Sequence, residues 1–284
     1  MKQIKKIAIQ GYPGSFHDAV CKQYFDQKVN VIPADNFNIL GSLLSSGSVD
    51  GAVMAIENSI AGTILQNYRI LREEKLWIIG EQYLRIKHNL LINAGTKRSD
   101  ITEVHSHPMA INQCLIYLRK NLKAKLVETE DTALSAKKLA ISKQKNVAVI
   151  ASKEAARRYG LEILDTDIET NKSNYTRFFF LQQSRARPTI DANKASIYIK
   201  IPDKKGQLMK VLQVIDHHDL NLSKLQSYPV LGTLRSYFFH LDIEFDQLQQ
   251  YLDLKVDLKS ITNEYTELGI YKRDEININN NPKS

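Results

Sequence analysis

Residues 4–16 read IKKIAIQGYPGSF, a strand pattern followed by a turn with two glycines and the start of a helix. The apolar residues of 4–10 predict a strand. Gly14 frees the backbone to approach a ligand, and a helix that begins at Ser15 offers unpaired N–H groups to an anion. The turn matches neither GxGxxG nor GxxxxGKS/T, so it is not a nucleotide-binding motif. It is either an anion-binding loop or an ordinary strand-to-helix turn.

The alternation of strands and helices continues to residue 181. We expect strands at 4–10, 29–33, 51–56, 77–79, 84–92, 101–104, 124–128, 147–150 and 177–181. We expect a helix from residue 15 and further helices at 37–44, 66–74, 109–122 and 132–142. Strands that alternate with helices of this length predict an α/β domain whose strands pair largely in parallel.

The pattern changes near residue 184. Residues 185–193 lack apolar periodicity and contain a proline, which predicts a linker between a domain at 1–184 and a domain at 194–272. In the second domain we expect strands at 195–201, 221–227, 234–243 and 265–271, and helices at 206–218 and 246–261. This order, βαββαβ, is the ferredoxin-like arrangement. Residues 273–284 form a polar tail, of which 277–284 are too polar to pack.

The composition is that of an ordinary globular protein. Of the 284 residues, 43% are hydrophobic and 25% are charged, which argues against a disordered, collagen-like or disulfide-scaffold protein. The net charge of +8 suits an anionic partner, but acidic and basic residues are interspersed and we find no nucleic-acid-binding motif. Two cysteines and no long apolar segment predict a cytoplasmic protein that binds neither membranes nor nucleic acids.

Polar residues follow several of the expected strands. Glu57, Asn58 and Ser59 come directly after the strand at 51–56, and Thr132 begins the helix after the strand at 124–128. Ligands in open α/β sheets bind at the carboxyl ends of strands, so these residues are candidates for binding. The compatible alternative is that Asn58 or Ser59 caps a helix.

Another polar group surrounds the start of the helix at 109–122. Ser106 follows a strand, Pro108 suits the first helical position, and Gln113 lies two turns beyond Ser106. His105 and His107 are two residues apart, which indicates a metal only weakly because no third group of ligands is nearby. We therefore expect no metal site here.

The segment at 174–178 closes the first domain. In an extended strand Asn174, Thr176 and Phe178 point to one side, and Tyr175 and Arg177 point to the other. A hydroxyl beside a guanidinium suits a substrate that carries a carboxylate. Together, these hydroxyls, amides and helix N-termini favour the binding of a small anion over covalent catalysis.

Five motifs, in this order, resemble those of the prephenate dehydratase family. They are GYPGSF (11–16), AIENSIAGTILQNY (55–68), SHPMAINQC (106–114), EDTALSAKKLA (130–140) and NYTRFFFL (174–181). The C-terminal βαββαβ unit resembles an ACT domain. The resemblance implies a catalytic domain of two α/β lobes, similar to type II periplasmic binding proteins, in a dimer or tetramer. It implies conversion of prephenate to phenylpyruvate in L-phenylalanine biosynthesis, without a cofactor.

The resemblance also implies roles for single residues. Thr176 is the expected catalytic threonine. On chemical grounds we expect its hydroxyl to donate a hydrogen bond or proton to the leaving hydroxyl, and Glu57, the available carboxyl group, to be the proton source. Arg177 is expected to hold a substrate carboxylate or to support the group that does. The other expected substrate-binding residues are Ser15, Asn58, Ser59, Ser106, Gln113, Thr132 and Phe178.

ACT domains of this family bind phenylalanine and mediate feedback inhibition. The residues expected to bind it here are Gly206, Leu208, Asn221, Leu222, Ser223, Gln226 and Ser227. Residues 226–229, Gln-Ser-Tyr-Pro, stand where the family has Glu-Ser-Arg-Pro. Loss of that charged pair predicts a weak or altered response to phenylalanine. The catalytic domain departs from the family at His17, where Ser or Thr is usual, and at Ser135, where alanine is usual.

Two other functions are compatible with the sequence. One is an arogenate dehydratase, whose substrate differs from prephenate by an amino group. The other is a non-enzymatic amino-acid-sensing protein. It would need a ligand-binding cleft between the two expected lobes, but neither Thr176 nor Glu57. The formation of phenylpyruvate distinguishes the enzyme from the sensor.

Overall fold

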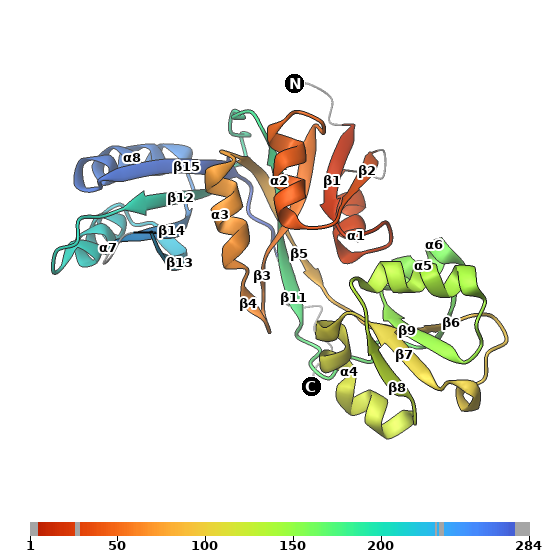
Figure 1. Ribbon diagram of the computed structural model, residues 1–284. Helices are drawn as coiled ribbons and strands as arrows, with labels where there is room; N and C mark the ends of the chain where they lie inside the picture. The colour runs from red at the N-terminus through yellow and green to blue at the C-terminus, as the bar shows by residue number, and fades with distance from the viewer. Residues whose placement is uncertain (1–4, 26–28, 231, 233–235, 276–284) are drawn as a thin grey trace. The chain divides into compact units, whose positions relative to one another are not determined.

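The structure is a computed structural model that describes residues 5–25, 29–230, 232 and 236–275 (Figure 1). The chain forms two compact units, one made of Met1–Ile64 and Tyr83–Phe178 and the other of Leu65–Gln82 and Phe179–Ser284. The residues predicted to be an unpacked tail, 277–284, lie outside the described ones. Within the described part of the chain, no helix has the length and hydropathy of a membrane span.

The first lobe is built on a sheet with the strand order β2-β1-β3-β11-β5, and β4 pairs with β3. The strands are β1 (Lys6–Gln10), β2 (Asn30–Ala34), β3 (Gly51–Asn58), β4 (Gly62–Thr63), β5 (Trp77–Arg85) and β11 (Tyr175–Gln182). As the alternation with helices predicts, β1 pairs in parallel with both β2 and β3. Ile7, Ala8 and Ile9 are fully buried, because both faces of this strand are covered.

Two helices of the first lobe begin at side-chain caps. Helix α1 (Phe16–Tyr24) follows β1, and helix α2 (Phe37–Ser45) follows β2. Ser15 and Asn36 each accept a hydrogen bond from the N–H group three residues ahead, at 3.3 and 2.9 Å. Such caps satisfy N–H groups that a helix leaves unpaired at its start. The turn after β1 therefore ends in a well-defined helix N-terminus.

The second lobe is a sheet with the strand order β10-β6-β9-β7-β8. Its strands are β6 (Asn89–Ile92), β7 (Glu103–Ser106), β8 (Lys125–Glu128), β9 (Val147–Ala151) and β10 (Glu162–Asp165). Its helices are η1 (Arg98–Asp100), α4 (Pro108–Asn121), α5 (Thr132–Ser142) and α6 (Lys153–Tyr159). β7 is parallel to β8 and β9, whereas β6 is antiparallel to β9 and β10.

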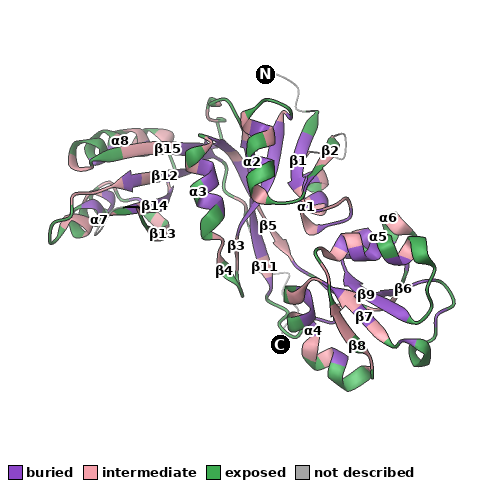
Figure 2. Ribbon diagram, in the orientation of Figure 1, coloured by how far each residue is buried: buried purple, intermediate pink, exposed green. Residues whose placement is uncertain are grey.

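The second sheet lies between two layers of helices. Leu90 and Ile92 of β6 pack in one core with α4, whereas Leu91 packs in another core with α5 and α6. This follows from the alternation of side chains along a strand. β6 and β9 are buried along their whole length, and the helices expose their outer faces (Figure 2).

The continuous strand predicted at 84–92 is wrong. β5 ends at Arg85 in the first sheet and β6 begins at Asn89 in the second, so the chain crosses between the lobes here. It crosses back at 166–174. Ile86 donates its N–H to the carbonyl of Asn174 at 2.7 Å, and Ile168 donates to that of His88 at 2.8 Å. The two crossing segments thus satisfy each other's backbone groups, which the apolar pattern alone does not reveal.

The second unit has the βαββαβ order predicted from the sequence. Its elements are β12 (Lys194–Lys200), α7 (Gln207–His217), β13 (Asn221–Pro229), β14 (Tyr237–Glu244), α8 (Leu248–Ile261) and β15 (Glu264–Tyr271). The four strands form an antiparallel sheet in the order β13-β14-β12-β15. Of the strand expected at 234–243, residues 234 and 235 lie outside the described ones.

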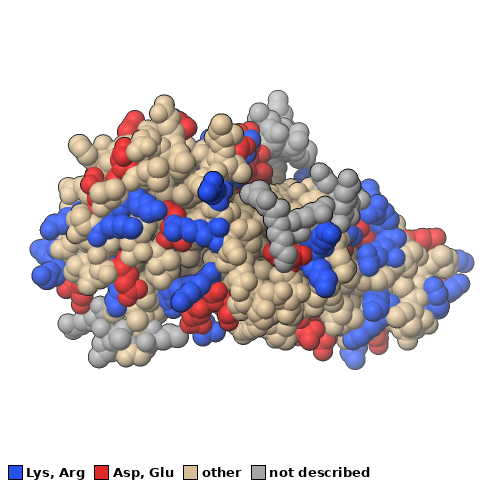
Figure 3. Space-filling model, turned by 90° about the horizontal axis from the view of Figure 1, so that it is seen from above, with Lys and Arg blue, Asp and Glu red and all other residues tan. Residues whose placement is uncertain are grey.

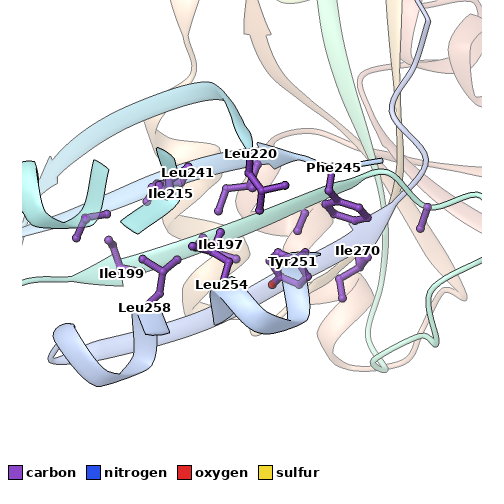
Figure 4. Close-up of a cluster of buried hydrophobic side chains, with 14 residues drawn as sticks. Ile197, Ile199, Ile215, Leu220, Leu241, Phe245, Tyr251, Leu254, Leu258 and Ile270 are labelled. Atoms are coloured by element: carbon purple, nitrogen blue, oxygen red, sulfur yellow. The ribbon is translucent and has the colours of Figure 1, made fainter. Parts of the chain in front are cut away.

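Both faces of this sheet are covered. Leu241 of β14 lies in the core with Ile215 of α7 and Leu254 of α8 (Figure 4). The neighbouring side chain, His240, alternates to the other face, where it is buried. There its ring meets the ring of Tyr68 at 4.4 Å between centroids, and Tyr68 belongs to α3 (Leu65–Glu73). Helix α3 is therefore part of the same unit.

Candidate active site

A cavity of about 390 Å³ lies in the first unit, lined by both lobes and the segments that cross between them. It is placed at the ends of β1 and β3 and at the starts of α1, α4 and α5. The predicted site residues that line it are Ser15, Asn58, Gln113, Thr132, Thr176 and Phe178. Its position at the carboxyl ends of strands is the one that an open α/β sheet favours for a ligand.

The hydroxyl of Thr176 is held in a fixed orientation. The side-chain amide of Asn58 donates hydrogen bonds to Oγ1 of Thr176 at 2.9 Å and to Oδ1 of Asn174 at 2.7 Å. Because Oγ1 accepts from Asn58, the hydroxyl proton is left for another acceptor. Thr176 is buried and lines the cavity, so it can donate that proton to a bound molecule.

The polar contacts continue from Asn174 into the second lobe. Asn174 donates to Oε1 of Gln113 at 3.0 Å, and Nε2 of His88 lies 2.8 Å from the same oxygen. Because Oε1 only accepts, Nε2 of His88 carries the ring proton and Nδ1 presents a lone pair. Burial lowers the pKa of His88, despite the opposing effect of Gln113. A polar chain therefore runs from Thr176 through Asn58, Asn174 and Gln113 to His88.

Two glycines bring the turn after β1 against the second lobe. Gly11 and Gly14 both have positive φ, +82° and +94°. A Cβ atom on Gly11 would lie 2.7 Å from Oδ2 of Asp131, and one on Gly14 would lie 3.1 Å from Cα of Ala155. The close backbone approach that the sequence suggests is therefore an approach to the second lobe.

Asp131 and Thr132 form the cavity wall at the start of α5. Asp131 caps the helix and accepts the N–H of Leu134 at 2.7 Å. Burial raises the pKa of Asp131, although the N–H groups of Leu134 and Ala133 act in the opposite direction. A carboxyl group with a raised pKa beside a cavity is suited to donate a proton.

Glu57 and Arg177 are not among the residues that line the cavity. The alternation of β11 brings Thr176 and Phe178 to the cavity, as predicted. The guanidinium of Arg177 is almost completely buried and lies 3.8 Å from the carboxylate of Glu57. It also lies 5.8 Å from the ring centroid of Tyr83. The structure thus pairs Glu57 and Arg177 with each other and does not bring them to the cavity.

Ser59 and Ser106 do not line the cavity either. Their hydroxyls form hydrogen bonds with backbone groups instead. The hydroxyl of Ser59 donates to the carbonyl of Ser173 at 2.8 Å and accepts the N–H of Tyr175 at 2.9 Å. That of Ser106 is fully buried and donates to the carbonyl of Ile150 at 2.7 Å. Ser59 therefore fixes the segment that carries Asn174.

The helix cap predicted at Asn58 or Ser59 is wrong. β3 continues to Asn58 and turns into β4, and the next helix starts only at Leu65. Oδ1 of Asn58 accepts the N–H groups of Ile60 and Ala61 at 3.0 and 2.9 Å. The side chain that orients Thr176 is thus itself anchored in this turn.

Two histidines that line the cavity, His17 and His88, are not among the predicted site residues. The ring of His17 lies edge-on to Phe178, with centroids 5.0 Å apart, and 5.7 Å from Phe37. Burial lowers the pKa of His17 to about 3, so this imidazole is neutral at neutral pH. The signal for His17 was its departure from the family pattern, whereas His88 stands in no motif.

The histidines on either side of Ser106 have protein partners. Nε2 of His105 lies 2.7 Å from a carboxylate oxygen of Glu103. His107 caps α4, and its Nδ1 accepts the N–H of Met109 at 3.2 Å. Each ring thus has a structural explanation that does not involve a metal.

The residues predicted to bind phenylalanine fall into two groups. Gly206 and Leu208 line a cavity of about 330 Å³ at the start of α7. The others lie on β13, an edge strand, and do not line that cavity: Asn221, Leu222, Ser223, Gln226 and Ser227. The described part of one chain does not bring the two groups to a common cavity.

Two α/β lobes around a polar cleft, followed along the chain by a ferredoxin-like βαββαβ unit, define the class of the protein. A sequence model of one family, described as prephenate dehydratase, matches residues 7–186. The chain belongs to the prephenate dehydratase family.

Known proteins resemble the chain in sequence and in structure. It is 35% identical to arogenate dehydratase 2 of Petunia hybrida over 79% of its length, but spans only 57% of that relative. The structure of prephenate dehydratase from Arthrobacter aurescens in complex with L-Phe has a TM-score of 0.84 and 28% identity, over 94% of this chain and 90% of that one. GqqA, described as a novel type of quorum-quenching acylase, has a TM-score of 0.85 and 27% identity, over 95% and 98%.

Proposed function

We propose that the protein is a prephenate dehydratase. The observation that carries the proposal is the hydroxyl of Thr176, which Asn58 holds so that its proton can reach a bound molecule. In the reaction, a C–C bond breaks to release CO2, and its electron pair enters the ring. The C–O bond of the ring hydroxyl breaks, and the leaving oxygen takes up one proton to become water. Because the product ring is aromatic, the protein mainly has to position the substrate and assist the leaving group.

The cavity offers a group for each task. Thr176 donates a hydrogen bond to the leaving hydroxyl. Asp131 supplies the proton in place of Glu57, because Asp131 lines the cavity and burial raises its pKa. Thr132, at the start of α5, binds a carboxylate through its hydroxyl, since a helix N-terminus favours negative charge. The aromatic ring of Phe178 packs against the substrate ring.

The role of Thr176 is tested by replacing it with alanine and with serine. In Thr176→Ala we expect kcat for phenylpyruvate formation, followed by absorbance, to fall by more than about tenfold with little change in KM. Thr176→Ser keeps the hydroxyl and should recover part of the loss. Wild-type turnover in Thr176→Ala would contradict the assignment.

The role of Asp131 has a separate test. Asp131→Asn keeps a side chain that caps helices well, so the fold of α5 should be retained. The wild-type kcat should fall as the pH rises through the raised pKa of Asp131, because the acid form is lost. The variant should be slow and should lack this decline. An unchanged pH profile in Asp131→Asn would assign the proton to another group.

A second candidate function is supported by the charge of the cavity. Glu130 and Asp131 line it, and none of its described lining residues is a lysine or arginine. This suits arogenate, which carries an ammonium group on its side chain. Parallel assays with prephenate and arogenate decide between them, and the substrate with the higher kcat/KM is the better fit.

We propose that phenylalanine binds between two copies of this chain, because the predicted binding residues form two groups that do not meet in one chain. Gln226 and Tyr228 replace a charged pair of the family, so we expect inhibition to be weak. The test combines light scattering for the oligomeric state with dehydratase assays over a range of phenylalanine concentrations. A monomer would contradict the interface, and sharp inhibition at micromolar phenylalanine would contradict the weak response.

A further inference from the structure

A second cavity, of about 420 Å³, lies in the second unit, where the end of α3, the start of β5, α8 and β15 meet. It shares no lining residue with the cavity of Thr176. One of its lining residues is Trp77, the only tryptophan in the sequence. The proposed dehydratase reaction leaves this cavity without a role.

The cavity is strongly basic. Its charged lining residues are Arg72, Lys75, Arg185, Lys255, Lys259 and a single acid, Glu267. Basic and acidic side chains are mixed over the face drawn in Figure 3, so a cavity lined almost entirely by one sign is a local feature. Positive charges gathered around one cavity repel each other, and a bound anion relieves that repulsion.

Glu267 does not balance the cavity, because two of the cations and a hydroxyl already engage it. It forms ion pairs with Arg185 and, at 2.7 Å, with Lys255. It also accepts a hydrogen bond from the hydroxyl of Tyr251 at 2.7 Å. Its one negative charge therefore offsets at most one of its two cationic neighbours.

Two lysines of the cavity have no acidic partner among the described residues. Lys75 follows α3 and is exposed, and no ion pair is formed by its ammonium group. Lys259 of α8 is exposed as well, and its ammonium lies 5.7 Å from the ring centroid of Tyr265. Both ammonium groups are available to a ligand.

Two guanidinium groups of the cavity are stacked on aromatic rings. Arg185 lies 4.8 Å from the ring centroid of Trp77, and Arg72 lies 4.3 Å from that of Phe238. Arg72 also lies 3.8 Å from Glu73 on its own helix. Stacking occupies the flat face of a guanidinium and leaves its N–H edge for an anion.

We propose that this cavity binds a small phosphate-bearing molecule with at least two negative charges. Ammonium groups and the N–H edges of guanidinium groups are the donors that proteins use for phosphate. The unbalanced positive charge exceeds what one carboxylate would neutralise. The volume lies in the range of pockets that hold small molecules, about 300–1,000 Å³.

Trp77 makes the site directly measurable. Tryptophan fluorescence is recorded while sodium pyrophosphate is added at constant ionic strength, and succinate is used in a second arm. We expect a saturable change with pyrophosphate and weaker binding of succinate. No saturable change, or succinate binding as tightly as pyrophosphate, would overturn the phosphate assignment.

A pair of charge variants locates the binding. Lys75→Asn combined with Lys259→Gln removes the two unpaired charges, and asparagine tolerates the positive φ of +52° at Lys75. We expect pyrophosphate to bind more than about tenfold more weakly, because two charge-assisted contacts are lost. The matched control, Lys120→Gln with Lys123→Gln, removes two exposed charges from the first unit and should bind as the wild type does. Equal binding by both variants would overturn the proposal.

The binding experiment is independent of the dehydratase reaction. Phenylpyruvate formation without pyrophosphate, measured on the same samples, should be unchanged by the two lysine substitutions in the second unit. A protein that binds pyrophosphate but forms no phenylpyruvate would contradict the proposed function alone. A protein that forms phenylpyruvate but shows no saturable fluorescence change would contradict the phosphate site alone.

Discussion

The two cavities have similar volumes, about 390 and 420 Å³, and opposite electrostatic character. The cavity of Thr176 is lined by amides, three hydroxyls, imidazoles, two acids and apolar side chains, without a lysine or arginine among its described residues. The cavity of Trp77 is lined by five basic side chains and one acid. A carboxylate that must leave as CO2 loses its charge in the transition state, so a strong cationic grip would stabilise the ground state. The net charge of +8 therefore says little about where the proposed chemistry takes place.

The largest effect is expected from breaking the neutral polar chain at Asn58. Asn58→Ala leaves the hydroxyl of Thr176 without the donor that fixes it, so we expect kcat to fall by more than about tenfold, with a smaller change in KM. Steady-state kinetics on folded protein measures this. Ser59→Ala serves as the neighbouring control and should lose less activity. A wild-type kcat in Asn58→Ala would show that the hydroxyl needs no fixed partner.

The next effect concerns the contact between the turn after β1 and the second lobe. Gly11→Ala places a Cβ atom 2.7 Å from Asp131, and Gly62→Ala has the same φ of +82° but no neighbour within 4 Å. The backbone strain common to both costs about 1–2 kcal/mol. Because the carboxylate of Asp131 must move aside and weaken its cap on α5, the free energy of unfolding of Gly11→Ala should fall by about 1 kcal/mol more. Equal free energies of unfolding of the two variants in urea denaturation would mean that the carboxylate of Asp131 moves aside without a loss of stability.

A smaller effect should appear in the free energy of unfolding at acidic pH. The pKa of His17 is about 3 in the folded chain and 6.5 in the unfolded one, so the unfolded chain takes up the proton first as the pH falls. The free energy of unfolding should therefore decrease below pH 6.5, by up to about 1.4 kcal/mol per pH unit for this one group. His17→Ser should flatten the slope, with the share due to His88 retained. The free energy of unfolding is measured by denaturation at several pH values. If it falls equally steeply with decreasing pH in both proteins, a neutral, buried His17 is excluded.

The smallest effect is expected at Glu57. It tests whether a charged residue that does not line the cavity contributes to catalysis. Glu57→Gln keeps an oxygen acceptor near Arg177 and removes a carboxylate that does not line the cavity. We expect kcat to change by less than about threefold, since no transition-state contact is lost. A large loss of kcat at constant stability would restore Glu57 as the proton source.

Periodic patterns predicted much of the fold. The alternation of strands and helices indicated the parallel pairs around β1, and the βαββαβ order indicated the C-terminal sheet. The strand predicted at 84–92 failed because a segment that crosses between two sheets can be as apolar as a strand. Its hydrogen-bond partners lie some 80 residues away in the second crossing segment, and no local pattern contains them.

The residues that line the cavity were predicted where side-chain alternation holds, and this prediction failed where the alternation breaks. In β11 side chains two residues apart point to the same face, and this correctly placed Thr176 and Phe178 together at the cavity. At the end of β3 the chain turns at once into the two-residue strand β4, and Glu57 pairs with Thr63 there. So short a strand has no sequence signature. The positions of Glu57 and Asn58 relative to the cavity therefore depend on a hairpin that only the structure reveals.

The polar chain from Thr176 to His88 has a mechanical consequence. Asn58 belongs to the first lobe and Gln113 to the second, and Asn174, which joins them, lies on a crossing segment. Any widening of the cleft that moves α4 away draws Gln113 from Asn174. Asn174 would then lose the contact that holds its amide against Asn58. The orientation of the Thr176 hydroxyl thus depends on the distance between the lobes, and the hydroxyl is fully oriented only when the lobes are close together.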